Sequence, residues 1–363
     1  MSLALPSRRL LPLLLILLLL FPLRSQSITD QPDGGATFDR LARYNPETNY
    51  FPGIHWQQAA TPEQLGWSSG KLQKAREYSR QLATDALVII DNGIVVEAWG
   101  HPTERFSCRS IRKSLLSALY GIHVGNGTIK LRKTLAEMGI DDNQKLSQTE
   151  KSATIADLLS ARSGVYHPAA YETETMREKR PERGSHAPGT FWYYNNWDFN
   201  ALLTIFEQET RTRFFQDFTT RIAVPLQMEQ FRPQDTKYHR EKSRSRHPAY
   251  LFNMSALDLA RFGLLYLRQG RWEDRQVIPA DWVTASTTPK TRFNESRSPR
   301  RGYGYLWHTA DEGYYAAGKG GSKVMIVPGR RLVIVLLVDA DKGHKVESRD
   351  FWKLLELILA AKT

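Results

Sequence analysis

The chain has 363 residues, of which 41% are hydrophobic and 24% charged, so it is long enough to bury a substantial core and has the composition of a globular protein. It contains a single cysteine, which excludes an intramolecular disulfide and with it the class of small disulfide-stapled domains. The net charge is +12. These values predict one large domain or two modest ones.

Residues 1–27 have the pattern of a secretory signal peptide. Two arginines near the start precede an almost wholly apolar run, residues 10–23, and small residues follow it in a way that suits cleavage near Ser27. The run is shorter than the ~20 residues that a membrane span needs, and an uncleaved anchor is the alternative. Because an exported protein without disulfides fits a bacterial periplasm, we expect a periplasmic or secreted protein that meets a membrane only through this segment, if it stays uncleaved.

The basic residues gather in three clusters with no aromatic pattern for stacking on bases. Acidic residues interrupt the clusters, and export argues against nucleic acid as the partner. A solvated surface and an anionic envelope component or substrate are the two interpretations that remain. The clusters are Arg177–Arg183, Lys237–Arg246 and Arg297–Arg301.

The first structured elements follow an extended N-terminal arm, residues 28–68, which is rich in Gly, Pro, Asn and Asp. Lys71–Leu82 has the apolar spacing of a helix, and Ser68 is placed to cap it. Two β-prone runs, Ala86–Ile90 and Ile94–Trp99, then flank an Asp-Asn-Gly turn, which is the strongest short-range signal of a hairpin.

The sequence Ser110-Ile-Arg-Lys113 begins the next predicted helix and places a hydroxyl and an amine one turn apart. A serine hydroxyl is a weak nucleophile until a base takes its proton, and a lysine can be that base when burial or nearby positive charge lowers its pKa. Ser68-Ser-Gly-Lys71 has the same spacing, but its capping position gives it a structural explanation.

The remaining elements predict an α/β (α+β) fold in which one antiparallel sheet is formed from both chain ends, with flanking helices and an inserted, mostly helical lobe at about 121–288. We assign residues 69–363 to this catalytic domain. Helical patterns cover residues 154–161, 200–209, 213–224 and 256–267, β signals return at 302–307, 314–317, 323–327 and 331–338, and a last helix covers 350–361.

Two later stretches carry chemistry. Pro188-Gly-Thr-Phe-Trp-Tyr-Tyr194-Asn-Asn196 brings a phenol and an amide, and an ammonium close to Tyr194 would stabilise its phenolate. Ala317-Gly-Lys-Gly-Gly-Ser322 is a glycine-rich run before a long apolar strand.

The three motifs, in this order, resemble those of the serine β-lactamase and penicillin-binding superfamily, which has S-x-x-K, then Y-x-N, then K-T-G or a glycine-containing substitute. The resemblance runs from about Ala86 to the C-terminus and includes Ala153–Gly164 and Pro225–Met228. It is strongest to class C β-lactamase-related hydrolases, the branch that also holds esterases and 6-aminohexanoate-dimer hydrolases.

The resemblance implies a role for each residue. Ser110 would be the nucleophile, Lys113 the adjacent base, and Tyr194 would share proton transfer as a phenolate or a neutral relay. Asn196 would hydrogen-bond Lys113 or the substrate amide. The oxyanion would be held by the N–H of Ser110 and one N–H from Gly320–Ser322, and no metal or organic cofactor is implied. The substrate and oxyanion residues are therefore Asn196, Gly318, Lys319, Gly320, Gly321 and Ser322, with Lys319 either binding a substrate carboxylate or facing solvent.

We therefore expect an exported serine hydrolase that cleaves an ester or amide in a small-molecule or peptide substrate. A β-lactamase or D-Ala-D-Ala peptidase, and a non-catalytic sensor of wall fragments, are the alternatives. The missing K-T-G, whose lysine and threonine help to hold the substrate carboxylate in this family, argues against a β-lactamase. The histidines show no metal-ligand spacing, and we expect structural or rim positions for His167, His186 and His308, with His186 at the cleft edge. The sequence leaves the oligomeric state open.

Overall fold

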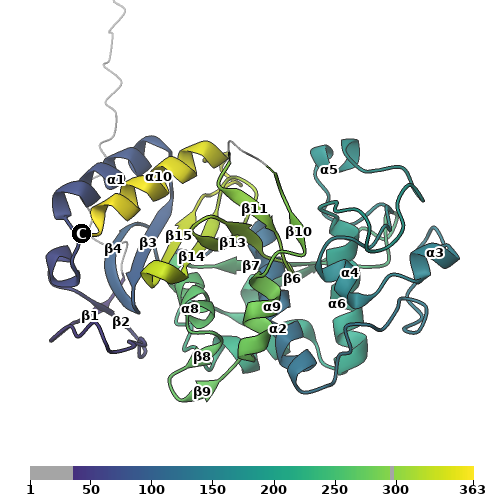
Figure 1. The fold of residues 1–363 in the computed structure, drawn as a ribbon, viewed down its shortest axis with the longest axis horizontal. Helices are drawn as coiled ribbons and strands as arrows, with labels where there is room; N and C mark the ends of the chain where they lie inside the picture. The colour runs from purple at the N-terminus through teal and green to yellow at the C-terminus, as the bar shows by residue number, and fades with distance from the viewer. Residues whose placement is uncertain (1–35, 295–297) are drawn as a thin grey trace, which may run out of the picture. The chain divides into compact units, whose positions relative to one another are not determined.

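A ten-stranded sheet built from both ends of the chain lies at the centre of the computed structural model, which describes residues 36–294 and 298–363 (Figure 1). The strand order is β1-β2-β4-β3-β15-β14-β13-β12-β11-β10, so the predicted hairpin lies beside the last strand of the chain. The predicted fold class is confirmed. The strands are β1 (Phe38–Arg40), β2 (Trp56–Gln58), β3 (Ala86–Asp91), β4 (Ile94–Gly100), β10 (Thr291–Arg292), β11 (Arg300–Tyr303), β12 (His308–Ala310), β13 (Gly313–Ala317), β14 (Lys323–Val327) and β15 (Leu332–Leu337).

The hairpin β3–β4 has the turn that the sequence predicts. Asn92 and Gly93 both have positive φ, 52° and 91°, as the favoured two-residue hairpin turn requires. A Cβ on Gly93 would lie 2.0 Å from the carbonyl oxygen of Tyr50, so the turn also lets the N-terminal arm approach closely. The arm itself adds β1 and β2 to the sheet edge in parallel pairing, which makes the sheet mixed rather than purely antiparallel.

The two faces of the sheet bury alternate side chains against different helices. Leu87 and Ile89 belong to the core under α1 (Ser69–Gln81) and α10 (Ser348–Ala361), which lie side by side (Figure 1). Val88 and Ile90 pack on the opposite face, in the core that contains α2 (Arg112–Gly125) and α8 (Ala256–Leu267). This period-2 alternation separates the two cores, and α2, which begins within the Ser110–Lys113 motif, lies in the core on one face of the central strands.

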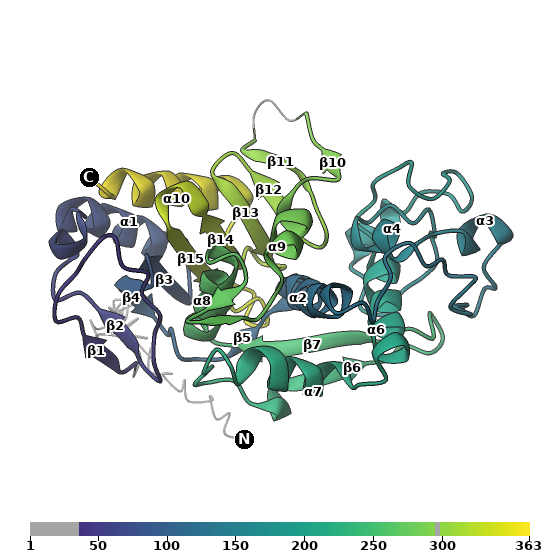
Figure 2. The same cartoon turned by 60° about the horizontal axis from the view of Figure 1, so that its bottom comes forward.

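A second sheet of three strands was not predicted. β5 (Phe106–Ser107) pairs with β7 (Ala249–Met254), which pairs with β6 (Thr236–His239), and Figure 2 shows these strands beneath α2. The N–H of Cys108 donates to the carbonyl of Phe252, so this sheet holds the chain just before Ser110. Cys108, the single cysteine of the chain, is fully buried and packs as a small core residue.

The other regular elements between α2 and β10 are mainly helices joined by long loops. Asn195 caps the long helix α6 by accepting a hydrogen bond from the N–H of Trp197, and the end of α7 continues into a π turn at Thr219–Ala223. The elements are α3 (Gln148–Lys151), α4 (Ile155–Leu159), α5 (Glu174–Glu178), α6 (Asn196–Thr210), α7 (Phe214–Phe218), β8 (Arg271–Trp272), β9 (Arg275–Gln276) and α9 (Ala280–Thr287).

The predicted signal peptide lies outside the described residues. Within the part of the chain that the structure describes, every helix is too short or too polar to cross a bilayer.

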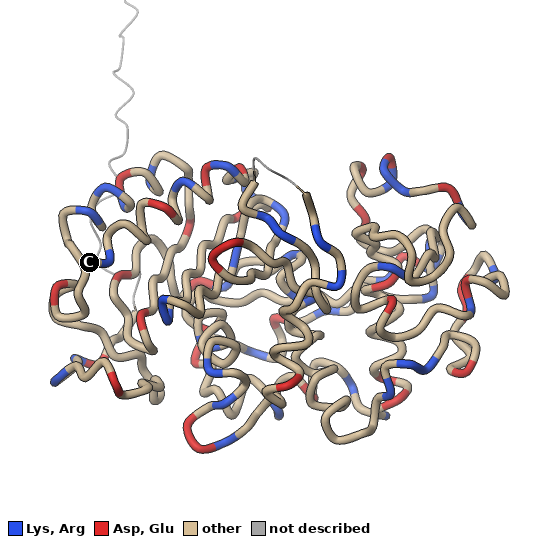
Figure 3. The backbone as a smooth tube through the Cα atoms, viewed as in Figure 1, with Lys and Arg blue, Asp and Glu red and all other residues tan. Residues whose placement is uncertain are grey.

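Acidic side chains pair with several arginines of the basic clusters. Figure 3 shows acidic residues interspersed with basic ones along the chain. Arg180 and Arg244 both lie near Glu172, and Arg183 pairs with Glu150 at 2.8 Å. This pairing favours a structural explanation of these arginines over a dedicated anion-binding face.

Candidate active site

Ser110 lies in a 3₁₀ turn, Arg109–Ile111, that leads directly into α2. The preceding residue, Arg109, has a left-handed φ of 50°, which is unfavourable for a residue with a side chain. Its guanidinium donates to the hydroxyl of Tyr171 at 2.7 Å and pairs with Asp341, and these contacts hold the turn. The nucleophile candidate is therefore held at a fixed, strained turn, as functional residues often are.

Lys113 lies between Ser110 and Tyr194. Its Nζ is 3.0 Å from Ser110 Oγ and 2.6 Å from the Tyr194 hydroxyl, and the Lys113 residue is only 2% exposed. Burial, followed by the charge of Arg112, holds the pKa of Lys113 well below its usual value. An unprotonated amine at this distance can accept the proton of Ser110.

The other Ser-x-x-Lys match has an ordinary structural role. Ser68 Oγ accepts a hydrogen bond from the N–H of Lys71, which confirms the predicted cap of α1. Lys71 Nζ donates to the carbonyl of Ala360 in α10, so this amine is bonded to the C-terminal helix.

Tyr194 completes a three-residue cluster. It lies two residues before α6, and burial raises the pKa of Tyr194 to about 12, opposed by a hydrogen bond with Ser110 and by the charge of Arg112. With the pKa of Lys113 lowered and that of Tyr194 raised, the pair favours a neutral amine beside a neutral phenol. Of the two forms that the sequence left open, this combination corresponds to the neutral relay.

Asn196 stands in the first turn of α6 and is 4% exposed. Its Nδ2 donates to the carbonyl of Tyr171 at 2.7 Å. Its Oδ1 is buried and has no hydrogen-bond partner among the described residues. Asn196 therefore retains one unused acceptor beside the cluster.

The glycine-rich run divides into two parts. Gly318 packs against the nucleophile turn, since a Cβ there would lie 2.9 Å from the carbonyl oxygen of Cys108. The following residues bond elsewhere: Gly321 N–H donates to Gly318 O, Gly320 O accepts from the N–H of Val346, and Ser322 Oγ accepts from the N–H of Val338. Lys319 is exposed.

The hydrogen-bond ladder points to Ala317 as the strand donor for an oxyanion. Gly318 N–H donates to Ser322 O on the β14 side, and Ala317 faces Lys323 in the same register. In an antiparallel ladder successive N–H groups point to opposite sides, so Ala317 N–H points away from β14, toward the edge of β13 that lies against the Ser110 turn. Ala317 N–H is therefore a candidate partner to the N–H of Ser110, beside the predicted Gly320–Ser322.

Gly318 provides a direct test of this arrangement. We expect Gly318→Ala to slow acylation of Ser110 about 10-fold or more, because the new methyl group must displace the Cys108 carbonyl or β13 and thereby shift the oxyanion donors. The matched control is Gly329→Ala, where no atom lies within 4 Å of the new Cβ. Equal acylation rates in both variants would contradict the close approach of β13 to the nucleophile.

His308, in β12, joins the cluster although the sequence indicated only a structural or rim position. Its ring stacks on Tyr194 with centroids 6.0 Å apart and on Tyr315 at 5.0 Å. Burial, reinforced by nearby positive charge, lowers the pKa of His308 to about 3, so the imidazole is neutral. The spacing of residues in the sequence could not identify His308, because it reaches Tyr194 only through the pairing of β12 in the sheet.

The other two histidines lie elsewhere in the fold. His167 bonds to Glu150 at 3.0 Å, and His186 bonds to Tyr166 and lines a shallow surface pocket of about 100 Å³ with Pro188. Across residues 36–294 and 298–363, no three His, Cys, Asp or Glu side chains gather closely enough to hold a metal ion.

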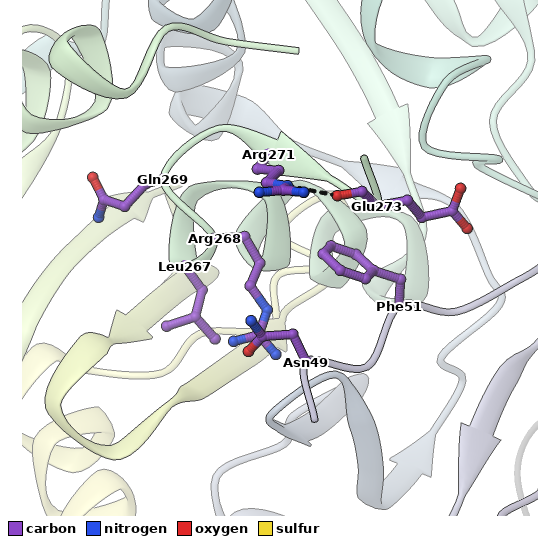
Figure 4. Close-up of a pocket in the computed structure, with 7 residues that line it drawn as sticks. All are labelled: Asn49, Phe51, Leu267, Arg268, Gln269, Arg271 and Glu273. Carbon is purple, nitrogen blue, oxygen red and sulfur yellow. Dashed lines mark hydrogen bonds between the residues drawn. The ribbon is translucent and has the colours of Figure 1, made fainter. Parts of the chain in front are cut away.

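A surface pocket of about 450 Å³ lies between the N-terminal arm and the end of α8 (Figure 4). Arg268 and Phe51 both line it, with the guanidinium 5.8 Å from the ring centroid. None of its lining residues belongs to the Ser110 cluster.

A two-ended sheet with a Ser-x-x-Lys helix packed on it and a tyrosine against the lysine defines the β-lactamase/transpeptidase-like class of proteins. The chain belongs to the β-lactamase family: the family model described as "Beta-lactamase" matches residues 71–358. No curated protein matches the sequence.

Solved structures share the fold at low sequence identity. A protein of Bacillus anthracis assigned as a 6-aminohexanoate-dimer hydrolase is 19% identical with a TM-score of 0.61, covering 78% of this chain and 80% of its own. A penicillin-binding protein homologue from Pyrococcus abyssi is 17% identical, with a TM-score of 0.60 and coverages of 80% and 76%. A β-lactamase from Mycobacterium bovis is 18% identical, with a TM-score of 0.56 and coverages of 80% and 99%.

Proposed function

We propose that this member of the β-lactamase family is an exported serine hydrolase that cleaves an ester or amide bond through an acyl-enzyme on Ser110. The observation that carries the proposal is the position of Lys113 Nζ, buried and within hydrogen-bond distance of both Ser110 Oγ and the Tyr194 hydroxyl. Export rests on the sequence of residues 1–27 alone.

The proposed reaction follows from which groups of the cluster can accept and donate a proton. Lys113 takes the proton as Ser110 Oγ attacks the carbonyl carbon, and the N–H groups of Ser110 and Ala317 hold the oxyanion. The proton then passes through Lys113 and Tyr194 to the leaving oxygen or nitrogen, and the acyl-enzyme forms. Water attacks the acyl-enzyme in the second half, with its proton accepted by the same pair and returned to Ser110.

The strand beside the nucleophile supports an ester or small amide as substrate. β13 ends in Ala316 and Ala317, whose side chains offer neither a charge nor a hydroxyl to a substrate carboxylate. The exposed Lys319 is the first cation after them. β-Lactams and D-Ala-D-Ala peptides carry a carboxylate, so we rank them second as substrates. Binding of a ligand without turnover is the third alternative.

Labelling with a fluorophosphonate followed by peptide mapping tests the proposed nucleophile. We expect the label on Ser110, because its hydroxyl is the serine hydroxyl within hydrogen-bond distance of a lysine amine in the described part of the chain, and none on Ser68. A panel of p-nitrophenyl esters, nitrocefin and D-Ala-D-Ala peptides then separates the substrate classes, with the esters turned over fastest. A label on Ser68, or wall-fragment binding without hydrolysis of any substrate, would overturn the proposal.

A further inference from the structure

Arg112 is a buried cation without a counter-charge beside the proposed active site. It is 1% exposed, and its Nε and Nη1 are buried without a hydrogen-bond partner in the described part of the chain. The guanidinium lies over the ring of Tyr250 at 4.4 Å and near that of Tyr171 at 5.8 Å. Across the described ranges, 36–294 and 298–363, no carboxylate forms an ion pair with it, although a buried charge ordinarily needs one.

The position of Arg112 in its helix is also unfavourable. Arg112 is the first residue of α2 and Lys113 the second, and the first turn of α2 contains no acidic residue. A helix N-terminus carries partial positive charge, which favours acidic side chains in the first turn. An arginine at this position therefore does not stabilise the helix. A residue that is buried without a counter-charge and also unfavourable for its helix is expected at a functional site.

We propose, on the basis of the proposed function, that Arg112 is a positioning residue whose uncompensated charge keeps Lys113 in its unprotonated, proton-accepting form. The two residues are adjacent in the first turn of α2, in a site with little water to screen the repulsion between two cations. Tyr250 provides the aromatic face that holds the guanidinium there without neutralising it.

The other groups around Lys113 do not replace this charge. Tyr194, Tyr303 and Tyr250 have raised pKa values and are neutral, the pKa of Asp198 is raised well above its usual range, and His308 is neutral. Arg300 and Lys323 act on His308, and the pKa of Lys323 is about 8. Arg109 is already paired with Asp341. Arg112, the adjacent residue in the helix and buried like Lys113, is thus the uncompensated cation whose charge acts on Lys113.

The test is the rate of fluorophosphonate labelling of Ser110 as a function of pH, which reports the base without requiring a substrate. In Arg112→Met and Arg112→Gln the acid limb of this profile should move to higher pH by about one unit or more, because Lys113 becomes easier to protonate. Arg112→Lys should restore the limb to its original position. Arg109→Met should lower the rate at every pH, because the contacts of Arg109 hold the nucleophile turn, but it should not move the limb, since Asp341 compensates that charge.

The outcomes separate this inference from the proposed function. If the unchanged protein does not label Ser110, the proposed function fails. If it labels Ser110 and the folded neutral variants lose rate equally at all pH values, Arg112 serves packing alone and the inference is wrong. If both neutral variants fail to fold while Arg112→Lys folds, the charge of Arg112 is needed to stabilise the fold. This result would also overturn the inference.

Discussion

Ser110→Ala is expected to lower turnover of the best p-nitrophenyl ester by about 10,000-fold or more and to abolish fluorophosphonate labelling. The substitution removes the hydroxyl that lies 3.0 Å from Lys113 Nζ at the strained turn, so no acyl-enzyme can form on this residue. Steady-state kinetics and intact-protein mass spectrometry measure the two effects. The free energy of unfolding should change by less than about 1 kcal/mol, because Ser110 is partly exposed and contributes little packing.

Ser68→Ala is the matched control for this experiment. Ser68 begins the second Ser-x-x-Lys sequence but caps α1, so its loss should cost about 1 kcal/mol of stability and leave labelling at Ser110 intact. Residual activity of several per cent in Ser110→Ala, or loss of labelling in Ser68→Ala, would place the nucleophile elsewhere.

Local sequence identified the central part of this site because its signals are short in range. Asn92-Gly93 determines a hairpin, Ser68 determines a helix start, and Ser110 and Lys113 share one helical face, so spacing alone could predict each. Tyr194 needed more: its distance in sequence from Lys113 is large, and only the resemblance to a family brought the two together.

Long-range packing explains what the sequence could not predict. His308 reaches Tyr194 through the order of strands in the sheet, and the N–H direction of Ala317 depends on the register with β14. β7 has the buried pattern of a strand at Ala249 and Tyr250, but it follows a basic loop and pairs with β5 far earlier in the chain. Such pairings have no local signature.

A sequence motif also does not reveal how deeply the site is buried. Ser-x-x-Lys gives the reach of the amine but not its protonation state, which depends on the Tyr194 and Phe199 rings 4.2 and 4.5 Å from Nζ and on Arg112. The chemistry of Lys113 is therefore a property of the folded protein rather than of the four-residue sequence.

Lys113→Met should reduce turnover by at least about 100-fold while the fold persists, since it removes the group that accepts the proton of Ser110 but retains an unbranched side chain. Tyr194→Phe, which leaves the ring and its stacking on His308 in place, should reduce turnover by a similar factor. In the unchanged protein the rate should fall as the pH drops through the lowered pKa of Lys113. Near-normal rates in both variants would remove the proposed base and relay.

The stability of Lys113→Met distinguishes lost chemistry from lost structure. Because the pKa of Lys113 is lowered on folding, the unfolded chain binds more protons between that value and the ordinary pKa, and stability rises with pH across this window. At neutral pH the lysine therefore destabilises the fold, and methionine removes this cost. We expect a higher melting temperature for Lys113→Met at pH 7, with the difference shrinking as the pH approaches the ordinary lysine value. An inactive variant with a lower melting temperature at pH 7 would show that Lys113 supports the fold, against the unprotonated base assigned to it.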